Sequence, residues 1–141
     1  MITISVLLGD PIVLSLVSGL LAALLSYHLN SVTLNKVGEE AITYLAPLIE
    51  ELLKTGLVLV IGGKVLLSHA IFGGVEALYD MRKNRGSKAY WAGFASLVSH
   101  SAFGAITQYF LYYFGKPVLG LSLAVVGHIV WNYSVLNFKK T

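Results

Sequence analysis

Three ionisable residues in the middle of an apolar segment constrain this chain more than any other feature. Glu50, Glu51 and Lys54 lie within APLIEELLKTG, residues 46–56, and the apolar run continues to Gly63. On a helix, Lys54 is a neighbour of both glutamates, at spacings of four and three residues. Inside a membrane each such group costs at least about 2.5–3.5 kcal/mol, so it must face a polar interior. A buried ion pair that only locks helix packing is one explanation. Because two carboxylates against one lysine leave a negative charge, the pattern favours a functional role.

The composition is that of an integral membrane protein. Of the 141 residues, 56% are hydrophobic and 12% are charged, whereas soluble domains have about 25% charged residues. We expect a single integral membrane domain over residues 1–141, with its core at 37–138. The absence of cysteine excludes disulfides and thiolate chemistry. No basic patch has the pattern of a nucleic-acid site, so the expected surroundings are a lipid bilayer and no nucleic acid.

The apolar segments predict an all-α fold, a polytopic membrane helix bundle of about five transmembrane helices. Asp10 and Pro11 are typical of the N-cap and first position of a helix. Residues 80–88, DMRKNRGSK, form the clearest loop, and 115–117 form a turn. Residues 1–8 are either an earlier helical turn or an interfacial arm. The expected spans cover residues 11–28, 37–61, 65–79, 89–114 and 118–138.

Positive charge predicts the orientation of the bundle, because Lys and Arg gather in cytoplasmic loops. With five spans, most of the basic residues fall on one side of the membrane, which gives an N-out/C-in arrangement. We expect an integral membrane protein in the plasma membrane of a prokaryote. The residues on the inner side are Lys36, Arg82, Lys83, Arg85, Lys88, Lys139 and Lys140.

Several other positions bear on the interior. Pro47 lies inside the second span and frees a backbone carbonyl near residue 43, close to the glutamates. The Gly73-Gly74 pair allows close helix approach. His69 falls near the start of the third span, where an interfacial position is expected. Glu39 and Glu40 fall at the start of the second span, where negative charge complements the helix dipole.

Polar residues on three spans are predicted to converge. Glu50, His100 and His128 each lie near mid-membrane, counted at 1.5 Å per residue along their helices. Asn132 follows His128 by four residues and shares its helix face, while Glu76 lies nearer the inner side. A glutamate can accept a proton from water, and imidazoles can bind a metal, shuttle protons or stabilise an oxyanion. The set therefore suits water activation, and it would also suit a proton or metal pathway.

Four motifs in order resemble a known family. They are EELLK (Glu50–Lys54) as Glu-Glu-x-x-Lys, FGGVE (Phe72–Glu76) as Phe-x-x-x-Glu, the histidine of SHSAFG (His100), and HIVWN (His128–Asn132) as His-x-x-x-Asn. The chain resembles the PrsW-type intramembrane proteases, within the larger group that includes the type II CAAX prenyl endopeptidases and the APH-1 subunit of γ-secretase. The match covers residues 41–137, four of the five expected spans.

The resemblance implies peptide-bond hydrolysis within or beside the membrane, with a membrane protein or peptide as substrate. By position, Glu50 would be the base that activates water, with Glu51 beside it in the catalytic set. His100 would help to bind or activate that water. His128 and Asn132 would bind water or a metal, or stabilise the tetrahedral oxyanion.

Two positions distinguish this chain from the CAAX enzymes. Lys54 and Glu76 stand where those enzymes typically have arginine and histidine, and both are assigned supporting roles here. This difference favours the PrsW branch and weakens any inference of a prenylated substrate.

The resemblance leaves the metal and the function class open. PrsW relatives are often classed as metallopeptidases, and Zn²⁺ is the possible cofactor; the CAAX relatives are described as metal-free. No His-Glu-x-x-His spacing decides the matter. A non-catalytic membrane scaffold and a proton- or metal-coupled transporter are the alternatives to an enzyme. The candidate metal ligands are Glu50, Glu76, His100 and His128.

Overall fold

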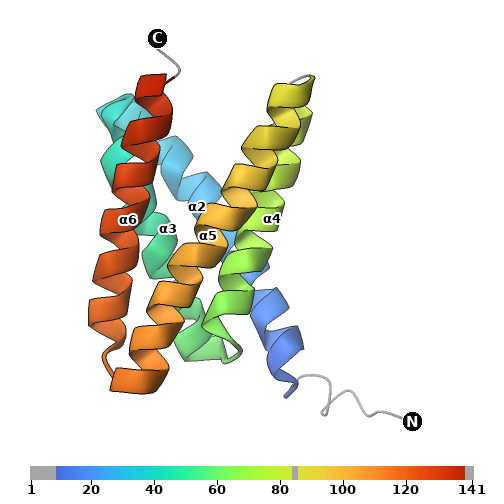
Figure 1. The fold of residues 1–141 in the computed structure, drawn as a ribbon, viewed down its shortest axis with the longest axis vertical. Helices are drawn as coiled ribbons and strands as arrows, with labels where there is room; N and C mark the ends of the chain where they lie inside the picture. Colours follow the sequence, from blue (N-terminus) through green and yellow to red (C-terminus); the bar gives the residue numbers. More distant parts are fainter. Residues whose placement is uncertain (1–8, 84–85, 139–141) are drawn as a thin grey trace.

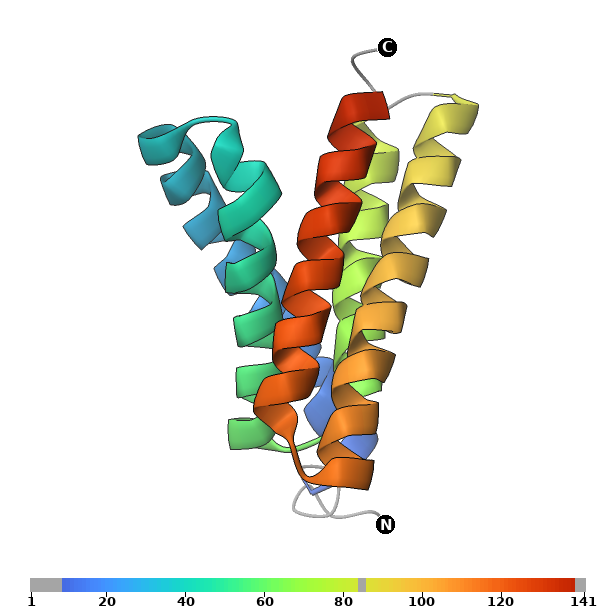
Figure 2. The same ribbon diagram turned by 60° about the vertical axis from the view of Figure 1, so that its left-hand side comes forward.

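The structure, a computed structural model, describes residues 9–83 and 86–138. Over these residues it is all-helical, which confirms the predicted all-α class (Figures 1 and 2). The expectations for residues 1–8 and for Lys139 and Lys140 lie outside the described part of the chain. The helices are α2 (Pro11–Val37), α3 (Glu40–Ile61), α4 (Val65–Lys83), α5 (Ser87–Phe114) and α6 (Pro117–Phe138).

Helix α2 begins as predicted and ends later than predicted. The Asp10 carboxylate accepts the backbone N–H groups of Ile12 (2.6 Å) and Val13 (3.4 Å), and Pro11 takes the first position. We predicted a span ending near His28, because asparagine and serine residues follow it. That prediction was wrong, since the helix continues unbroken to Val37. A polar residue ends a helix only where its side chain caps the backbone, and Asn30 has another partner, described below.

The turn between α3 and α4 is tied to the start of α2. Gly62 and Gly63 have φ of +102° and +107°, which only glycine adopts readily. A Cβ atom on Gly63 would lie 2.7 Å from the backbone nitrogen of Ser15. The Lys64 N–H donates to the Ser15 hydroxyl at 2.7 Å. The chain therefore passes directly over α2 at this end of the bundle.

Helices α4 and α5 are both longer than predicted, and they pack closely. Helix α4 runs to Lys83 and α5 begins at Ser87, so the loop predicted for residues 80–88 is shorter. The basic side chains in the last turn of α4 complement the helix dipole, which favours the extension. A Cβ atom on Gly73 would lie 3.0 Å from the Cβ of His100, which confirms close approach there. Gly74 faces open space.

The helices diverge toward the end where the α2–α3 and α4–α5 connections lie (Figures 1 and 2). Helix α4 packs along α5, and α2 packs on both α3 and α4. Helix α6 contacts α5 and α3 and closes the bundle on the other side. Figure 1 shows the α4–α5 pair leaning away from α3 and α6 toward the end at which α6 ends. Figure 2 shows α2 and α3 leaning away from α6 at the same end.

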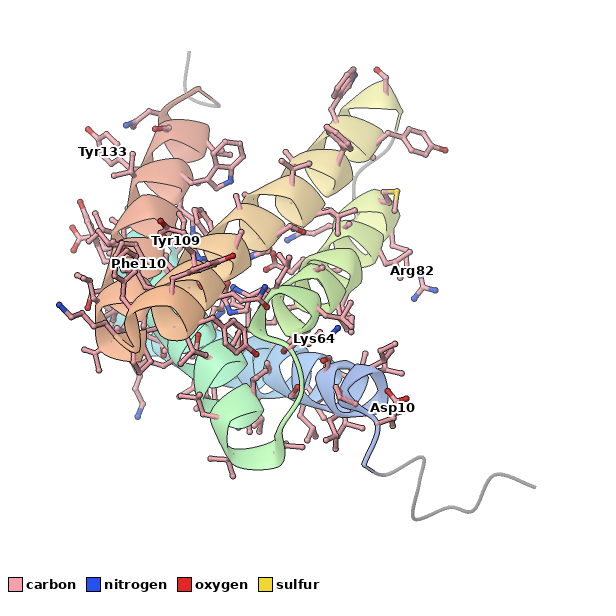
Figure 3. The ribbon with its side chains drawn as sticks, turned by 60° about the horizontal axis from the view of Figure 1, so that its bottom comes forward. Asp10, Lys64, Arg82, Tyr109, Phe110 and Tyr133 are labelled. Carbon is pink, nitrogen blue, oxygen red and sulfur yellow. The ribbon has the colours of Figure 1, made fainter. Side chains whose placement is uncertain are left out.

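The polarity of the bundle is inverted relative to a soluble domain. Among the described residues, buried polar and charged side chains outnumber buried hydrophobic ones. Large apolar side chains cover the outside, and some are almost fully exposed, such as Val60 at 84% and Val118 at 74%. Tyr133 and Arg82 point away from the bundle in Figure 3. An apolar surface of this extent is typical of a protein that contacts a membrane or other proteins.

Within the described ranges, two helices are long and apolar enough to cross a membrane. They are α2 and residues Pro117–Asn137 of α6. The prediction of five spans is therefore confirmed only in part. Helix α3 carries Glu50, Glu51 and Lys54 at its middle, and α4 ends in a charged segment, which lowers the hydropathy of both.

Candidate functional site

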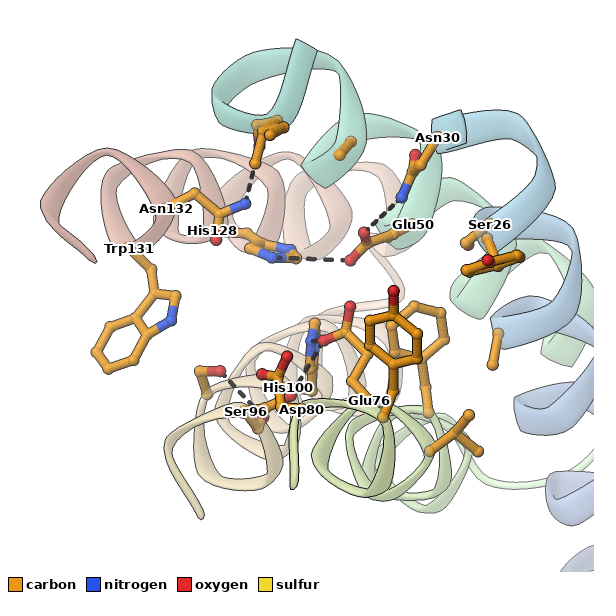
Figure 4. A pocket seen from close by; sticks show the side chains of 18 of the residues that line it. Ser26, Asn30, Glu50, Glu76, Asp80, Ser96, His100, His128, Trp131 and Asn132 are labelled. Carbon is orange, nitrogen blue, oxygen red and sulfur yellow. Dashed lines mark hydrogen bonds and ion pairs between the residues drawn. The ribbon is translucent and has the colours of Figure 1, made fainter. Parts of the chain in front are cut away.

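A cavity of about 780 Å³ lies among the diverging helices, and all five helices contribute to its wall (Figure 4). At the end with the α2–α3 and α4–α5 connections it is lined by Leu34, Ile42, Asp80 and Leu136. It extends along the bundle to Glu50, Glu76, His100 and His128. Its volume is within the range of ligand pockets, roughly 300–1,000 Å³. The structure therefore brings predicted polar residues from four helices to one cavity.

Glu50 on α3 faces this cavity with one oxygen held and one free. Its Oε1 accepts a hydrogen bond from Asn30 of α2 at 2.8 Å. Its Oε2 is buried and has no hydrogen-bond partner among the described residues. The Nε2 of His128 lies 3.8 Å from that oxygen (Figure 4). A buried oxygen left unsatisfied costs about 1–3 kcal/mol, so the site favours a small polar molecule beside it.

Glu51 has a different role, although it is the next residue. Its side chain is fully buried and does not line the cavity. Its Oε1 accepts from the Lys54 ammonium at 2.5 Å and lies 3.0 Å from Nδ1 of His128. Because a carboxylate only accepts, the His128 hydrogen belongs on Nδ1. Nε2 of His128 therefore carries a lone pair, directed toward Glu50.

His100 is held in the opposite tautomer. Its Nδ1 lies 2.9 Å from the Lys54 ammonium, which can only donate, so Nδ1 accepts. Its Nε2 therefore carries the hydrogen and donates to Oε2 of Glu76 at 2.5 Å. The same Glu76 oxygen accepts from the Ser96 hydroxyl at 3.0 Å. The Glu76 side chain is 40% exposed, so this carboxylate reaches the cavity.

Aromatic rings fix both imidazoles in place. The His100 and His128 rings meet edge to face with their centroids 4.9 Å apart. Phe103 stacks on His128 at 5.0 Å, and Phe72 packs edge to face against His100 at 5.0 Å. The Lys54 ammonium lies 4.4 Å from the centre of the Phe72 ring, on its face. These contacts restrict rotation of both histidines and stabilise the buried cation.

Asn132 lines the cavity but takes its hydrogen bond elsewhere. Its side-chain N–H donates to the backbone carbonyl of Ile42 at 3.0 Å, five residues before Pro47 on α3. Asn132 thus lies on the same side of α6 as His128, as its spacing predicts, and joins α6 to the start of α3.

The residues in this arrangement do not fit a bound metal. One ligand atom each from Glu50, His100 and His128 lie within 4.8 Å of one another. However, both nitrogens of His100 are engaged, one by the Lys54 ammonium and the other by Glu76. A metal would have to break one of these contacts to obtain a lone pair from His100, and Glu76 would lose its partner. These residues therefore do not favour binding of Zn²⁺.

Sequence reasoning missed two residues of the site. Asn30 was assigned to a helix end, yet it bonds to Glu50. His69 was expected at an interface, and that was wrong, since it is fully buried beside Glu51. For Asn30 a signal was present: small and polar residues recur every three or four positions along α2 and define the buried face on which it lies. These residues are Ser15, Ser18, Ala22 and Ser26.

Comparison of the chain with protein-family models, curated proteins and solved structures finds no match. The resemblance to the PrsW-type proteases therefore depends on the four sequence motifs alone.

The different environments of the two glutamates predict different effects on stability. Glu51→Gln leaves the buried Lys54 without its anion, and breaking a buried pair costs about 3–5 kcal/mol. Glu50→Gln removes a buried charge, and Oε2 of Glu50 has no partner to lose. The free energy of unfolding should therefore stay unchanged or rise. Thermal unfolding of the purified variants in detergent measures both effects. Equal losses in the two variants would contradict the assignment, and adding Lys54→Met to Glu51→Gln should recover part of the loss.

Proposed function

We propose that the protein is an intramembrane endopeptidase that hydrolyses membrane-associated substrates with a water molecule activated by Glu50. One observation carries the proposal: the free oxygen of Glu50 and the lone pair of His128 face each other across 3.8 Å at the base of the cavity. Both atoms are acceptors, so neither can satisfy the other while Glu50 is ionised. A single water can donate one hydrogen to each, because two hydrogen bonds of about 2.7–2.8 Å span this gap.

The polarity of the fold supports a membrane location for all five helices. Helix α2 and residues Pro117–Asn137 of α6 are mostly exposed, with only 33% and 17% of their most apolar segments buried, whereas a core helix of a soluble protein is mostly buried. The charged residues at the middle of α3 are turned inward, where they add nothing to the outer surface. Helix α3 can therefore cross a bilayer despite carrying three ionisable side chains.

Charge supports an N-out/C-in orientation with the cavity directed to the cytoplasm. Lys36 at the end of α2 and Arg82 and Lys83 at the end of α4 lie at the end of the bundle lined by Leu34 and Asp80. Positive residues favour the cytoplasmic side. A substrate segment would then reach Glu50 from that side, along the cavity between α4–α5 and α3–α6.

The residues present supply each step of hydrolysis. Glu50 takes a proton from water as the water oxygen adds to the substrate carbonyl carbon. The proton then passes from Glu50 to the departing amide nitrogen as the carbon–nitrogen bond breaks. The products are a carboxylic acid and an amine, and Glu50 returns to its ionised form. Asn30 orients the carboxylate through its other oxygen.

A donor on the cavity wall can relieve the negative charge on the tetrahedral intermediate. The Nε2–H of His100 is already donated to Glu76, so His100 instead holds that carboxylate on the wall facing Glu50 (Figure 4). Asn132 has a second amide hydrogen besides the one given to Ile42. Donors placed before the reaction cost no reorganisation when the charge develops.

A non-catalytic scaffold is the main alternative, and the free Glu50 oxygen is the feature that disfavours it. A scaffold gains from the satisfied Glu51–Lys54 pair but gains nothing from an unpaired carboxylate beside a cavity.

The orientation predicts where two positions lie. Reporter fusions at Lys88 and at Thr141 should both give cytoplasmic signals, because five spans and the basic residues place them on the same side. An external signal at either fusion would contradict the five-span arrangement.

The proposed chemistry predicts that Glu50→Gln abolishes cleavage without unfolding the protein. The amide keeps the size and one hydrogen bond but cannot take the proton, so the rate should fall roughly 10²–10⁴-fold. Cleavage of a panel of single-span substrates by purified protein in liposomes measures this rate. Glu39→Gln and Glu40→Gln are matched controls at the start of the same helix, and both should retain the wild-type rate. A folded Glu50→Gln protein with wild-type activity would falsify the proposal.

The engagement of His100 predicts that activity does not require a metal. Cleavage should survive extended treatment with EDTA and 1,10-phenanthroline, and elemental analysis of the active protein should find no stoichiometric metal. Loss of activity on chelation, with recovery on adding Zn²⁺, would show that His100 releases Glu76 or Lys54 to bind it.

A further inference from the structure

We infer that His69 is a positioning residue of this site: it donates its Nδ1–H to the free oxygen of Glu51 and thereby holds His128 in its working tautomer. The positioning role rests on the proposed function, whereas the hydrogen bond itself does not. None of the four motifs that resemble the PrsW-type proteases includes His69.

Two orphaned atoms carry the inference. Oε2 of Glu51 and Nδ1 of His69 are both buried, and neither has a hydrogen-bond partner among the described residues. They lie 3.5 Å apart, and both side chains are fully shielded from solvent. An unpaired polar atom at such depth is costly, and a small rotation of the ring brings the two atoms into hydrogen-bond geometry.

The other ring nitrogen sets the direction of this bond. The hydroxyl of Thr55 lies 3.4 Å from Nε2 of His69, where it can donate. If Nε2 accepts, the single hydrogen of the neutral ring is on Nδ1, directed at Glu51. Glu51 then accepts three donors: Lys54 and His128 on Oε1, and His69 on Oε2.

Helix α5 leaves a place for this ring. A Cβ atom on Gly104 would lie 2.6 Å from the Cβ of His69 and 3.2 Å from its Nδ1. Any side chain at position 104 would push the imidazole away from its present position. Gly104 therefore leaves the imidazole room to lie beside Glu51.

Holding both oxygens has a consequence at the cavity. A carboxylate bonded through one oxygen can turn about its last torsion, which is broad. With Oε2 also bonded, Oε1 stays in place for Nδ1 of His128, and Nε2 of His128 stays directed toward Glu50. Second partners of this kind orient a working histidine in many sites.

Nitrogen NMR of the purified protein, labelled with ¹⁵N-histidine, tests the hydrogen bond directly. The chain has four histidines, so each signal can be assigned from a variant that lacks it. We expect His69 and His128 to carry their hydrogen on Nδ1, and His100 to carry it on Nε2. A hydrogen on Nε2 of His69 would overturn the inference.

Substitutions at position 69 separate positioning from packing. In His69→Asn the amide nitrogen replaces Nδ1 as a donor, whereas His69→Leu fills the space without one. We expect His69→Leu to lower the cleavage rate by about 10²-fold, the effect of displacing a catalytic group by about 1 Å. The His128 signal should then show mixed tautomers. His69→Asn should keep the His128 signal and most of the rate, and equal losses in both variants would refute positioning.

Gly104→Ala provides a second test that leaves His69 present. Its methyl group should displace the ring and disturb the His128 signal as His69→Leu does. Gly74→Ala on α4, where a Cβ meets nothing within 4 Å, is the matched control and should change neither signal nor rate. The NMR measurements need no substrate. The expected tautomers without any cleavage would therefore refute the proposed enzyme activity and support the His69–Glu51 hydrogen bond. Cleavage activity with the hydrogen on Nε2 of His69 would support the enzyme activity and refute the hydrogen bond.

Discussion

The ion pair between Glu51 and Lys54 is the interaction on which the rest of the interior depends. Both side chains are fully buried, with 2.5 Å between the ammonium and the carboxylate oxygen. Such a pair repays its desolvation only if other hydrogen bonds satisfy its remaining atoms. Lys54 therefore reaches His100 on α5 and the face of Phe72 on α4, while Glu51 reaches His128 on α6. One pair on α3 thus sets the orientation of side chains on three other helices.

The two glutamates are neighbours in sequence with opposite environments. Successive residues on a helix point about 100° apart, so Glu51 faces the packed interior while Glu50 faces the cavity. Glu51 is held by several donors and serves as an anchor. Glu50 keeps one oxygen free in a cavity lined by all five helices. The same functional group thus provides a fixed point and a reactive one.

Features that depend on neighbouring residues were predictable. Asp10 and Pro11 start α2, Gly115 with φ of +61° ends α5, and the Gly62-Gly63 pair ends α3, because caps and positive φ angles are local properties. Helix ends marked only by polar residues were not predictable. Asn30 was interpreted as part of a helix end, and the loop at residues 80–88 was predicted to be longer than it is. The sequence alone does not show which group a polar side chain will bond to.

The sequence by itself determined that the chain is helical and that Glu50, Glu51, Lys54, His100 and His128 need a common polar interior, because burying each alone is too costly. Only the tertiary structure decided which atoms meet. Asn30 binds Glu50 across 20 residues, and His128 binds Glu51 across 77. Such pairings depend on how the packed helices are rotated and crossed. Helical periodicity shows which residues share a face of one helix, but not how that helix sits against its neighbours. The tautomer of each histidine and the place of His69 beside Glu51 follow from that packing.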